Sequence, residues 1–394
     1  MNLLLESCQN FNKLLPNWGE PEEVVRKIPK NPGLQDQIQK LSTLLNSCGE
    51  VYAPSGNIPS PDGKQSFRAI CWNIERGKNF SGILQTLQQH PLLRNADFYF
   101  LTEVDWGMAR SSNHHVSAEL AESLGYFAYF TPSYYNLSKG HGAERSSQAE
   151  NTMGLHGKAL LSRYPLAELR TVPLPNCHDK LRSKESRVGQ KRALLADLKI
   201  GKRSVRLAVA HLDAFSSPQS RRRQLLPAVQ ECAKSENVLL GGDWNTNTLD
   251  STSTPRLLSK LLFQVATVRP VRMIRNHLPY PERRFDRPLF QMLHQAGFDT
   301  AACNILGEGT YDLVSNDKEL GQMASDQYPR WAIKAINRLI IKAGGRMQFK
   351  LDWFATKNLK CLHRQVVRLD DGQGPKLQHR ASDHHPILLD FQLP

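Results

Sequence analysis

The sequence predicts an α/β protein in which mixed β-sheets are covered by helices. Short apolar runs recur from residue 67 onward, and near-continuous apolar strands are typical of sheets that are buried on both faces. Helix-like segments lie between several of these runs. The connections vary between hairpin length and helix length, which favours mixed sheets with helices outside. The chain has 394 residues, of which 40% are hydrophobic, so it can bury such a core.

The expected elements follow in chain order. We expect strands at FRAICWNI (67–74), DFYFLTEV (97–104), GKALLSRY (157–164), RALLADLKI (192–200), VRLAVAHL (205–212), NVLLGGDW (237–244), FKLDWFAT (349–356) and HPILLDFQL (385–393). We expect helices near residues 3–15, 34–47, 80–90, 115–124, 220–235 and 288–297.

The first 65 residues differ from the rest. Two helical stretches are followed by YAPSGNIPSPDGKQ, a segment rich in Pro, Gly and Ser that is typical of a loop or linker. Because a unit of this size stabilises itself poorly, we interpret residues 1–65 as an N-terminal helical extension and linker packed on the core. Residues 66–394 then form the main domain, with insertions near 249–287 and 310–347.

Composition indicates the compartment and the class of partner. The chain has no apolar stretch of membrane-spanning length and no secretory signal pattern, and its seven cysteines are scattered. Reduced thiols in the cytoplasm are the expected state. The formal charge of +14 favours a polyanionic partner, namely nucleic acid, an anionic membrane surface or a phosphorylated small molecule. The sequence indicates no protein partner.

Polar side chains recur where the apolar runs end. Taken singly, each has an ordinary explanation as a turn, cap or structural residue. The set and its order are more informative than any member. In chain order these residues are Asn73 and Glu75, Glu103 and Asp105, His211 and Asp213, Asp243 and Asn245, Asp352, and Asp383 with His384.

This order resembles the endonuclease/exonuclease/phosphatase superfamily, whose members have the deoxyribonuclease I-like fold. The most specific motifs are GDWN (243 is its Asp) and SDHHP, supported by WNI, LTEV and ALLSRYPL, and the resemblance covers residues 68–392. It implies a four-layer sandwich of two packed mixed β-sheets flanked by helices. It also implies active-site loops at one edge and divalent-metal-dependent hydrolysis of phosphoric esters.

The GDWN motif has a simple geometric interpretation. In extended backbone, residues i and i+2 point to the same side, so Asp243 and Asn245 are expected to project into one pocket while Trp244 packs in the core. Gly241 and Gly242 permit a close backbone approach or an unusual dihedral angle at the bend. The strand would thereby hold a carboxylate and an amide rigidly.

The resemblance also assigns a metal site. It makes Glu103 the principal metal ligand, with Asn73 beside it, and Asp383 is close enough in the chain to join them. Oxygen ligands of this kind suit Mg²⁺, and Mn²⁺ is possible.

The remaining roles concern water and the phosphate. By resemblance, Asp243 orients or deprotonates the attacking water, and Asn245 fixes that water or a phosphate oxygen. His384 contacts the phosphate, and Asp352 holds the imidazole in one tautomer. His211 matches a histidine of the deoxyribonuclease I and sphingomyelinase branches, where it assists at the phosphate or leaving group.

Some positions depart from the family pattern. Many relatives have Gly-Asn-Ala where this chain has GKA, and we expect Lys158 to contact phosphate. Glu75 and Asp105 are expected to be salt-bridged loop acids, and His385 is expected to be structural. The histidines at 114, 115, 141, 156 and 178 match no zinc spacing.

The substrate is less well determined than the reaction. The basic loop 178–192 suits a nucleic-acid backbone. In the segment 328–345, Lys334, Arg338 and Lys342 share one helical stripe that could lie on a membrane or on nucleic acid. The favoured hypothesis is a nuclease acting on DNA or RNA. The alternatives are a phospholipid, phosphoinositide or sphingomyelinase-like hydrolase at a membrane surface and, as a lesser alternative, a non-catalytic phosphate-binding module.

Overall fold

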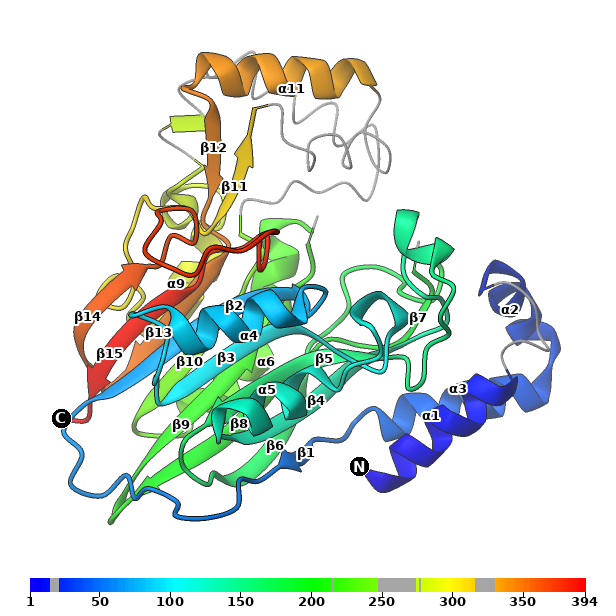
Figure 1. Ribbon diagram of the computed structural model, residues 1–394, viewed down its shortest axis with the longest axis horizontal. Coiled ribbons are helices and arrows are strands. Elements are labelled where there is room, and N and C mark those ends of the chain that lie inside the picture. Colours follow the sequence, from blue (N-terminus) through cyan, green and yellow to red (C-terminus); the bar gives the residue numbers. More distant parts are fainter. Residues whose placement is uncertain (15–20, 184, 215, 247–273, 276–277, 316–329) are drawn as a thin grey trace.

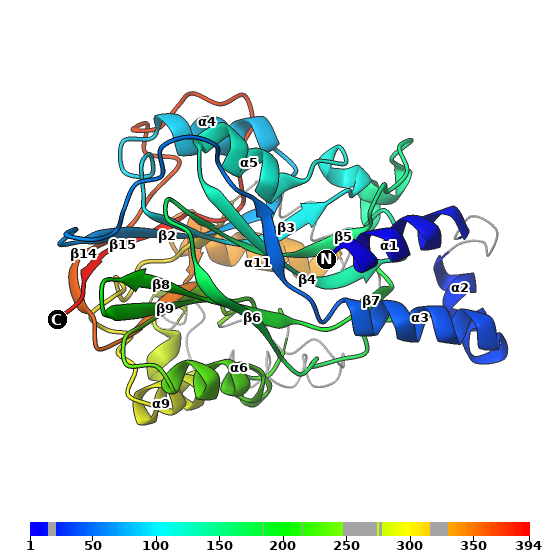
Figure 2. The ribbon, with the colours of Figure 1, turned by 90° about the horizontal axis from the view of Figure 1, so that it is seen from below.

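The computed structural model describes all residues except 15–20, 184, 215, 247–273, 276–277 and 316–329. Two mixed β-sheets pack face to face, and helices cover the outer face of each (Figure 2). This confirms the predicted four-layer sandwich. The expected helices and strands are present, with ends shifted by a few residues.

The larger sheet forms one half of the sandwich. Its strands, in spatial order, are β1 (Gly49–Tyr52), β4 (Phe127–Asn136), β5 (Leu155–Ser162), β3 (Phe98–Trp106), β2 (Phe67–Arg76), β15 (Ile387–Gln392) and β14 (Lys360–Val366), and β7 (Arg187–Gly189) pairs with β4. Strands β2 and β3 are parallel. The other pairings in this sheet are antiparallel.

The smaller sheet forms the other half. Its spatial order is β13 (Asp352–Lys357), β10 (Val238–Asp243), β9 (Arg203–Ala210), β8 (Arg192–Ile200) and β6 (Ala167–Pro173). Strands β9 and β10 are parallel, and the remaining pairs are antiparallel. Each sheet therefore contains a parallel pair whose carboxyl ends can deliver side chains to a common edge.

Apolar residues form three stacked layers of core. Between the sheets, Phe100 of β3 meets Phe354 of β13 edge to face at 5.7 Å. Outside the larger sheet, α4 (Phe80–Gln89) and α5 (Val116–Leu124) bury their apolar faces. Outside the smaller sheet, α6 (Pro218–Ala233) and α9 (Arg287–Gln295) do the same.

The N-terminal helices pack on one end of the sandwich. They are α1 (Asn2–Leu14), α2 (Pro21–Lys27) and α3 (Pro32–Leu44). Their apolar residues form a cluster with β4, β5 and β7, in which Phe11 meets Tyr135 edge to face at 5.3 Å. Strand β1 follows α3 and pairs with β4 at the edge of the larger sheet.

A hairpin and a helix rise above the sheets, at the top of Figure 1. Strands β11 (Tyr311–Val314) and β12 (Arg346–Phe349) pair antiparallel, and α11 (Arg330–Lys342) packs on them through Ile340. We call these three elements the arm. Much of the expected insertion at 249–287, and residues 316–329 of the second insertion, lie outside the described residues. Among the described residues, no helix combines the length and apolar character needed to cross a membrane.

Candidate active site

The predicted site residues lie at the edge where the two parallel strand pairs end. Asn73 and Glu103 come from the carboxyl ends of β2 and β3. Asp243 is the last residue of β10, and His211 directly follows β9. The neighbouring antiparallel strand β13 begins at this same edge. Side chains that are far apart in the chain therefore converge here.

Three buried groups form the centre of the site. Asp243 and Asp352 are register partners across β10 and β13. His384, from the loop before β15, donates from Nδ1 to Asp352 Oδ2 at 2.8 Å. One ligand atom from each of the three residues lies within 4.8 Å of the others. The structure thus brings the predicted His384–Asp352 pair directly beside Asp243.

The His384 backbone is fixed by its surroundings. The indole nitrogen of Trp72 donates to the His384 carbonyl at 3.0 Å, and the hydroxyl of Ser382 accepts from the His384 amide at 3.2 Å. The same hydroxyl donates to the carbonyl of Asn73 at 2.6 Å. On the arm, the Tyr311 ring lies 5.4 Å from the imidazole. These contacts position one histidine between both sheets and the arm.

Asp243 is held by several polar neighbours. Its Oδ2 accepts from Asn73 Nδ2 at 3.0 Å and lies 3.6 Å from His211 Nε2. Its Oδ1 accepts from the Asn245 amide at 2.9 Å. Trp244 is buried beside Trp353, as the sequence predicts. Asp243 is therefore in contact with three other predicted site residues, which are Asn73, His211 and Asn245.

The expected extended geometry at Asn245 is wrong in detail. Strand β10 ends at Asp243, and Asn245 has a left-handed φ of 49°. Its side-chain amide turns to the Leu212 carbonyl, to which Nδ2 donates at 3.0 Å. The chain bends because this turn ties the end of β10 to the end of β9. Asn245 still lies beside Asp243, but the contact runs through its backbone amide.

Gly242 allows β10 to approach β9. Its φ is 149°, and a Cβ built there would lie 1.8 Å from the Ala210 carbonyl oxygen. Any side chain would therefore force the two strands apart. The close approach keeps Asp243 next to His211, so the glycine in the GDWN segment has a direct structural reason.

Burial and neighbouring charges shift the pKa values of the central groups. Burial and the charge of Asp352 raise the pKa of Asp243 to about 7. Burial alone would lower the pKa of His384, but Asp352 and Asp383 raise it well above its ordinary value. The centre therefore holds a carboxyl group that titrates near neutrality and an imidazole that stays protonated there.

Glu103 occupies a strained position beside these groups. Its φ is 53°, and the pairing of β3 with β5 shifts register at this residue. Its Oε2 lies 3.7 Å from Arg76 Nε. Burial alone would raise the pKa of Glu103, but Arg76 and His156 lower it to about 2. Glu103 is thus an ionised carboxylate at the site edge.

Glu75 and Asp383 add to this acidic group. Glu75 pairs with Lys78 at 3.2 Å, which confirms the expected salt bridge. Burial and the charge of Asp383 nevertheless raise the pKa of Glu75, and Glu103 contributes to this shift. The three carboxylates therefore lie close enough to repel one another, as acids do around a cation site. Sequence reasoning placed Glu75 outside the site.

Buried lysines line the same edge. Lys158 is 1% exposed and donates to Ser133 Oγ at 2.9 Å. The structure thus places this predicted phosphate ligand inside the protein. Burial and the charges of Lys191 and Lys158 hold the pKa of His211 well below its ordinary value. Lys191 belongs to the basic loop and was missed, because nothing in a basic loop distinguishes one lysine from another.

Two other residues have the structural roles that the sequence predicts. Asp105 accepts two hydrogen bonds from Arg110, at 2.7 and 3.0 Å, and one from His156. His385 faces away from His384 and lies 3.3 Å from Asp312. Further His and acid groups occur at His141 and at Asp312, but ion pairs with arginines accompany both. These groups are ion-pair networks.

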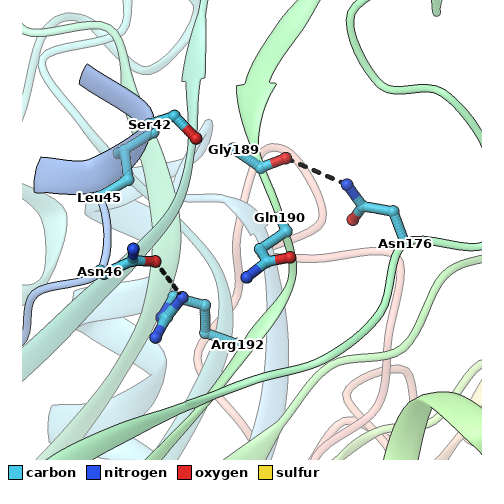
Figure 3. A pocket seen from close by; sticks show the side chains of 7 residues that line it. All are labelled: Ser42, Leu45, Asn46, Asn176, Gly189, Gln190 and Arg192. Carbon is cyan, nitrogen blue, oxygen red and sulfur yellow. Dashed lines mark hydrogen bonds between the residues drawn. The ribbon is translucent and has the colours of Figure 1, made fainter. Parts of the chain in front are cut away.

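A small polar cavity of about 160 Å³ lies beside the site region, between α3 and the segment that leads into β8. Its lining includes Asn46, Asn176 and Arg192, and Arg192 donates to the Asn46 side chain (Figure 3). The cavity contains none of the predicted site residues.

Comparison with known protein families identifies one family. The profile of the Endonuclease/Exonuclease/phosphatase family matches residues 70–384. A search of curated protein sequences finds no match. The chain is similar to an endonuclease/exonuclease/phosphatase from Beutenbergia cavernae, at 16% identity over 84% of this chain and 72% of that chain, with a TM-score of 0.48.

Two further solved structures are similar to it. The human Nocturnin catalytic domain with bound sulfate has 15% identity over 88% of this chain and 97% of its own, with a TM-score of 0.43. TDP2 from D. rerio, complexed with a single-strand DNA product, has 13% identity over 84% of this chain and 100% of its own, with a TM-score of 0.43. The family profile spans most of the chain, including every predicted site residue. The protein belongs to the endonuclease/exonuclease/phosphatase family.

Proposed function

We propose that this protein is a divalent-metal-dependent phosphodiesterase and that its substrate is nucleic acid. The reaction is supported chiefly by one observation. Asp243, Asp352 and His384, which come from three separate segments, form a buried cluster beside the carboxylate of Glu103. Hydrolysis at phosphorus requires a base for water and positive groups for the phosphate oxygens, and this cluster supplies both.

Asp243 is the base of the proposed reaction. A pKa of about 7 makes its carboxylate a stronger base than an ordinary aspartate and leaves about half of it ionised at neutral pH. Asn73 and the Asn245 amide orient this carboxylate by hydrogen bonds. Asp243 accepts a proton from the water whose oxygen attacks phosphorus, while the bond from phosphorus to the leaving oxygen breaks.

His384 and His211 act on the phosphate. The protonated His384 donates a hydrogen bond to a phosphate oxygen and offsets the negative charge that develops there. Asp352 positions this imidazole through Nδ1, which leaves Nε2 to face the substrate. His211 is neutral because of burial and nearby lysines, and it donates a hydrogen bond on the leaving-group side.

The acidic residues fit a hard divalent cation. Glu103 and Asp383 supply carboxylates, and Asn73 supplies an amide oxygen, which together are a donor set suited to Mg²⁺ or Mn²⁺. The mutual repulsion that raises the pKa of Glu75 is the electrostatic signature expected where a cation balances several acids. When bound, the ion would provide Lewis-acid stabilisation of the phosphate oxygens.

The substrate proposal depends on charge near the site. The net charge is +14, and Lys334, Arg338 and Lys342 are exposed along one side of α11. The arm that carries this stripe begins at Tyr311, which bridges to His384. A polyanion held by the stripe would therefore reach the site along the arm.

The reaction is tested with a generic diester. Purified protein with Mg²⁺ is expected to hydrolyse bis(p-nitrophenyl) phosphate, and His384→Ala should abolish this hydrolysis while circular dichroism stays unchanged. The matched control is Lys202→Met, which alters an exposed turn. A wild-type protein that is inert with Mg²⁺ and with Mn²⁺ would refute the proposed reaction.

The substrate class is tested by assaying nucleic acids and lipids side by side. We expect digestion of plasmid and single-stranded oligonucleotides and no release of headgroups from anionic liposomes. The triple variant Lys334→Gln, Arg338→Gln and Lys342→Gln should weaken oligonucleotide binding. The slope of log affinity against log salt concentration should become shallower by an amount that corresponds to about three lost phosphate contacts. Hydrolysis of liposomal lipid alone would instead identify a phospholipase.

A further inference from the structure

The inference concerns Lys191, a buried lysine at the start of β8. Its neighbours Gln190 and Arg192 line the small polar cavity (Figure 3). Successive residues of extended chain point to opposite sides, so Lys191 points the other way, toward the catalytic edge. There its Nζ donates to the Leu212 carbonyl at 3.1 Å, directly beside His211.

The Lys191 ammonium group is buried and forms no ion pair with any residue that the structure describes. The residue is 6% exposed, and within the described part of the chain no carboxylate lies within ion-pair distance of Nζ. The ammonium has three N–H donors, and the one hydrogen bond formed within the described residues is to a neutral carbonyl. Buried charges are normally paired, because removing an ion from water is costly.

Lys158 has the same property. It lies across β3 from the site, as the register partner of Thr102, and its ammonium donates only to the neutral hydroxyl of Ser133 within the described residues. Lys180 from the same loop differs, because it forms an ion pair with Asp213 at 2.6 Å. Within the residues that the structure describes, one buried lysine near His211 is therefore ion-paired and two are not.

The charges that act on Lys191 come from Asp213 and from the catalytic residues. Burial lowers the pKa of Lys191 to about 8, and the charge of Asp213, followed by those of Glu103 and Asp243, acts against this shift. The ammonium thus lies within electrostatic reach of the proposed metal ligand and of the proposed base. An anion bound between these residues would meet free N–H donors at this point.

We infer that Lys191 is a further phosphate-binding residue of the active site, which donates hydrogen bonds to a non-bridging oxygen of the scissile phosphate. This inference rests on the proposed function for its substrate class. Lys191 transfers no proton, and its contribution is a charge-assisted hydrogen bond.

The test measures binding of inorganic phosphate and does not require turnover. In the presence of Mg²⁺, titration calorimetry should show phosphate binding to the wild type and a loss of roughly 10- to 100-fold in affinity for Lys191→Met. Lys191→Arg should recover part of the affinity, because it restores a cationic donor. Lys202→Met, an exposed lysine, should bind phosphate as the wild type does.

Thermal unfolding distinguishes binding from a structural role. Removing an unpaired buried charge should raise the melting temperature of Lys191→Met in phosphate-free buffer, and added phosphate should stabilise the wild type more than the variant. A lower melting temperature with unchanged phosphate affinity would overturn the inference, as would a wild type that binds no phosphate.

Hydrolysis of bis(p-nitrophenyl) phosphate separates the two proposals. If the wild type is inert but Lys191→Met loses phosphate affinity, the inference about Lys191 stands and the proposed reaction fails. If the wild type is active and Lys191→Met keeps both its kcat and its phosphate affinity, the reaction stands and Lys191 is not a phosphate ligand.

Discussion

Asp243 and Asp352 face each other as register partners at the ends of β10 and β13, so two buried carboxyl groups lie side by side. His384 hydrogen-bonds to one of them, Asp352, at 2.8 Å. The other is Asp243, and burial together with the charge of Asp352 raises the pKa of Asp243 to about 7. The pair therefore combines an orienting acid with a base that titrates near neutrality.

The raised pKa of Asp243 predicts a pH dependence of stability. A carboxyl group whose folded pKa exceeds its ordinary value of 3.8 favours folding fully below that value, and the benefit disappears as pH rises through the folded pKa. In metal-free protein, we expect the free energy of unfolding to decline between about pH 4 and pH 7, and Asp243→Asn should remove this part of the decline. Urea denaturation across this range measures it. Parallel pH profiles for the two proteins would contradict the prediction.

Removing the charge of Asp352 should impair catalysis more than folding. Asp352→Asn replaces the carboxylate that stabilises the protonated imidazole of His384 with a neutral amide. As a result, kcat/KM should fall by roughly 10²- to 10⁴-fold. The rate is measured with bis(p-nitrophenyl) phosphate at saturating Mg²⁺. Asp371→Asn, an exposed loop substitution, serves as the control and should keep the wild-type rate. A change of less than about twofold in Asp352→Asn would exclude the orienting role.

The order of polar residues at the strand ends predicted where the site lies, because neighbouring parallel strands of a sheet end at the same edge. Asn73, Glu103 and Asp243 reach one edge for this reason alone. Strand β4 was not predicted. Its sequence FAYFTPSYYN contains Pro132, which is unfavourable inside a strand, and the structure accommodates it at a register shift between Pro132 and Tyr134.

Other details depended on contacts between distant segments. The left-handed turn at Asn245 exists because its amide binds the carbonyl of Leu212, and no local pattern in TNT or DWN encodes that partner. Burial of Lys191 follows from the packing of the loop before β8 against the end of β9. The basic loop 178–192 was interpreted as a surface for a nucleic-acid backbone, but Glu185 and Lys191 within it are buried.

Gly242 should tolerate no side chain. A Cβ there would lie 1.8 Å from the Ala210 carbonyl oxygen, so Gly242→Ala must separate β9 from β10 and should cost roughly 3 kcal/mol or more. Gly63→Ala is the matched control, because Gly63 also has a positive φ, of 77°, but nothing lies within 4 Å of its built Cβ. It should cost only about 1 kcal/mol. Equal losses in urea denaturation would show that the close approach is unimportant.

The buried Asp105–Arg110 pair should be essential for folding. Asp105 accepts two hydrogen bonds from Arg110 and one from His156, and all three side chains are buried. Burial alone would raise the pKa of Asp105, but Arg110 and His156 hold it well below its ordinary value. The stability from this carboxylate is therefore fully present above about pH 4 and is lost only as pH falls toward the depressed pKa.

Asp105→Asn should therefore destabilise the protein by roughly 3–5 kcal/mol at pH 7, because it removes one of the two buried carboxylates, Asp105 and Glu185, that pair with Arg110. Asp197→Asn is the comparison, since Asp197 also binds an arginine, Arg206, through two hydrogen bonds, but these side chains keep 8–9% of their surface exposed, against 0–1% for Asp105 and Arg110. Partial exposure lets water replace the lost partner, so this variant should lose less. Urea denaturation at pH 7 ranks the two. If Asp197→Asn were the more damaging substitution, burial would not be what makes the Asp105 pair strong.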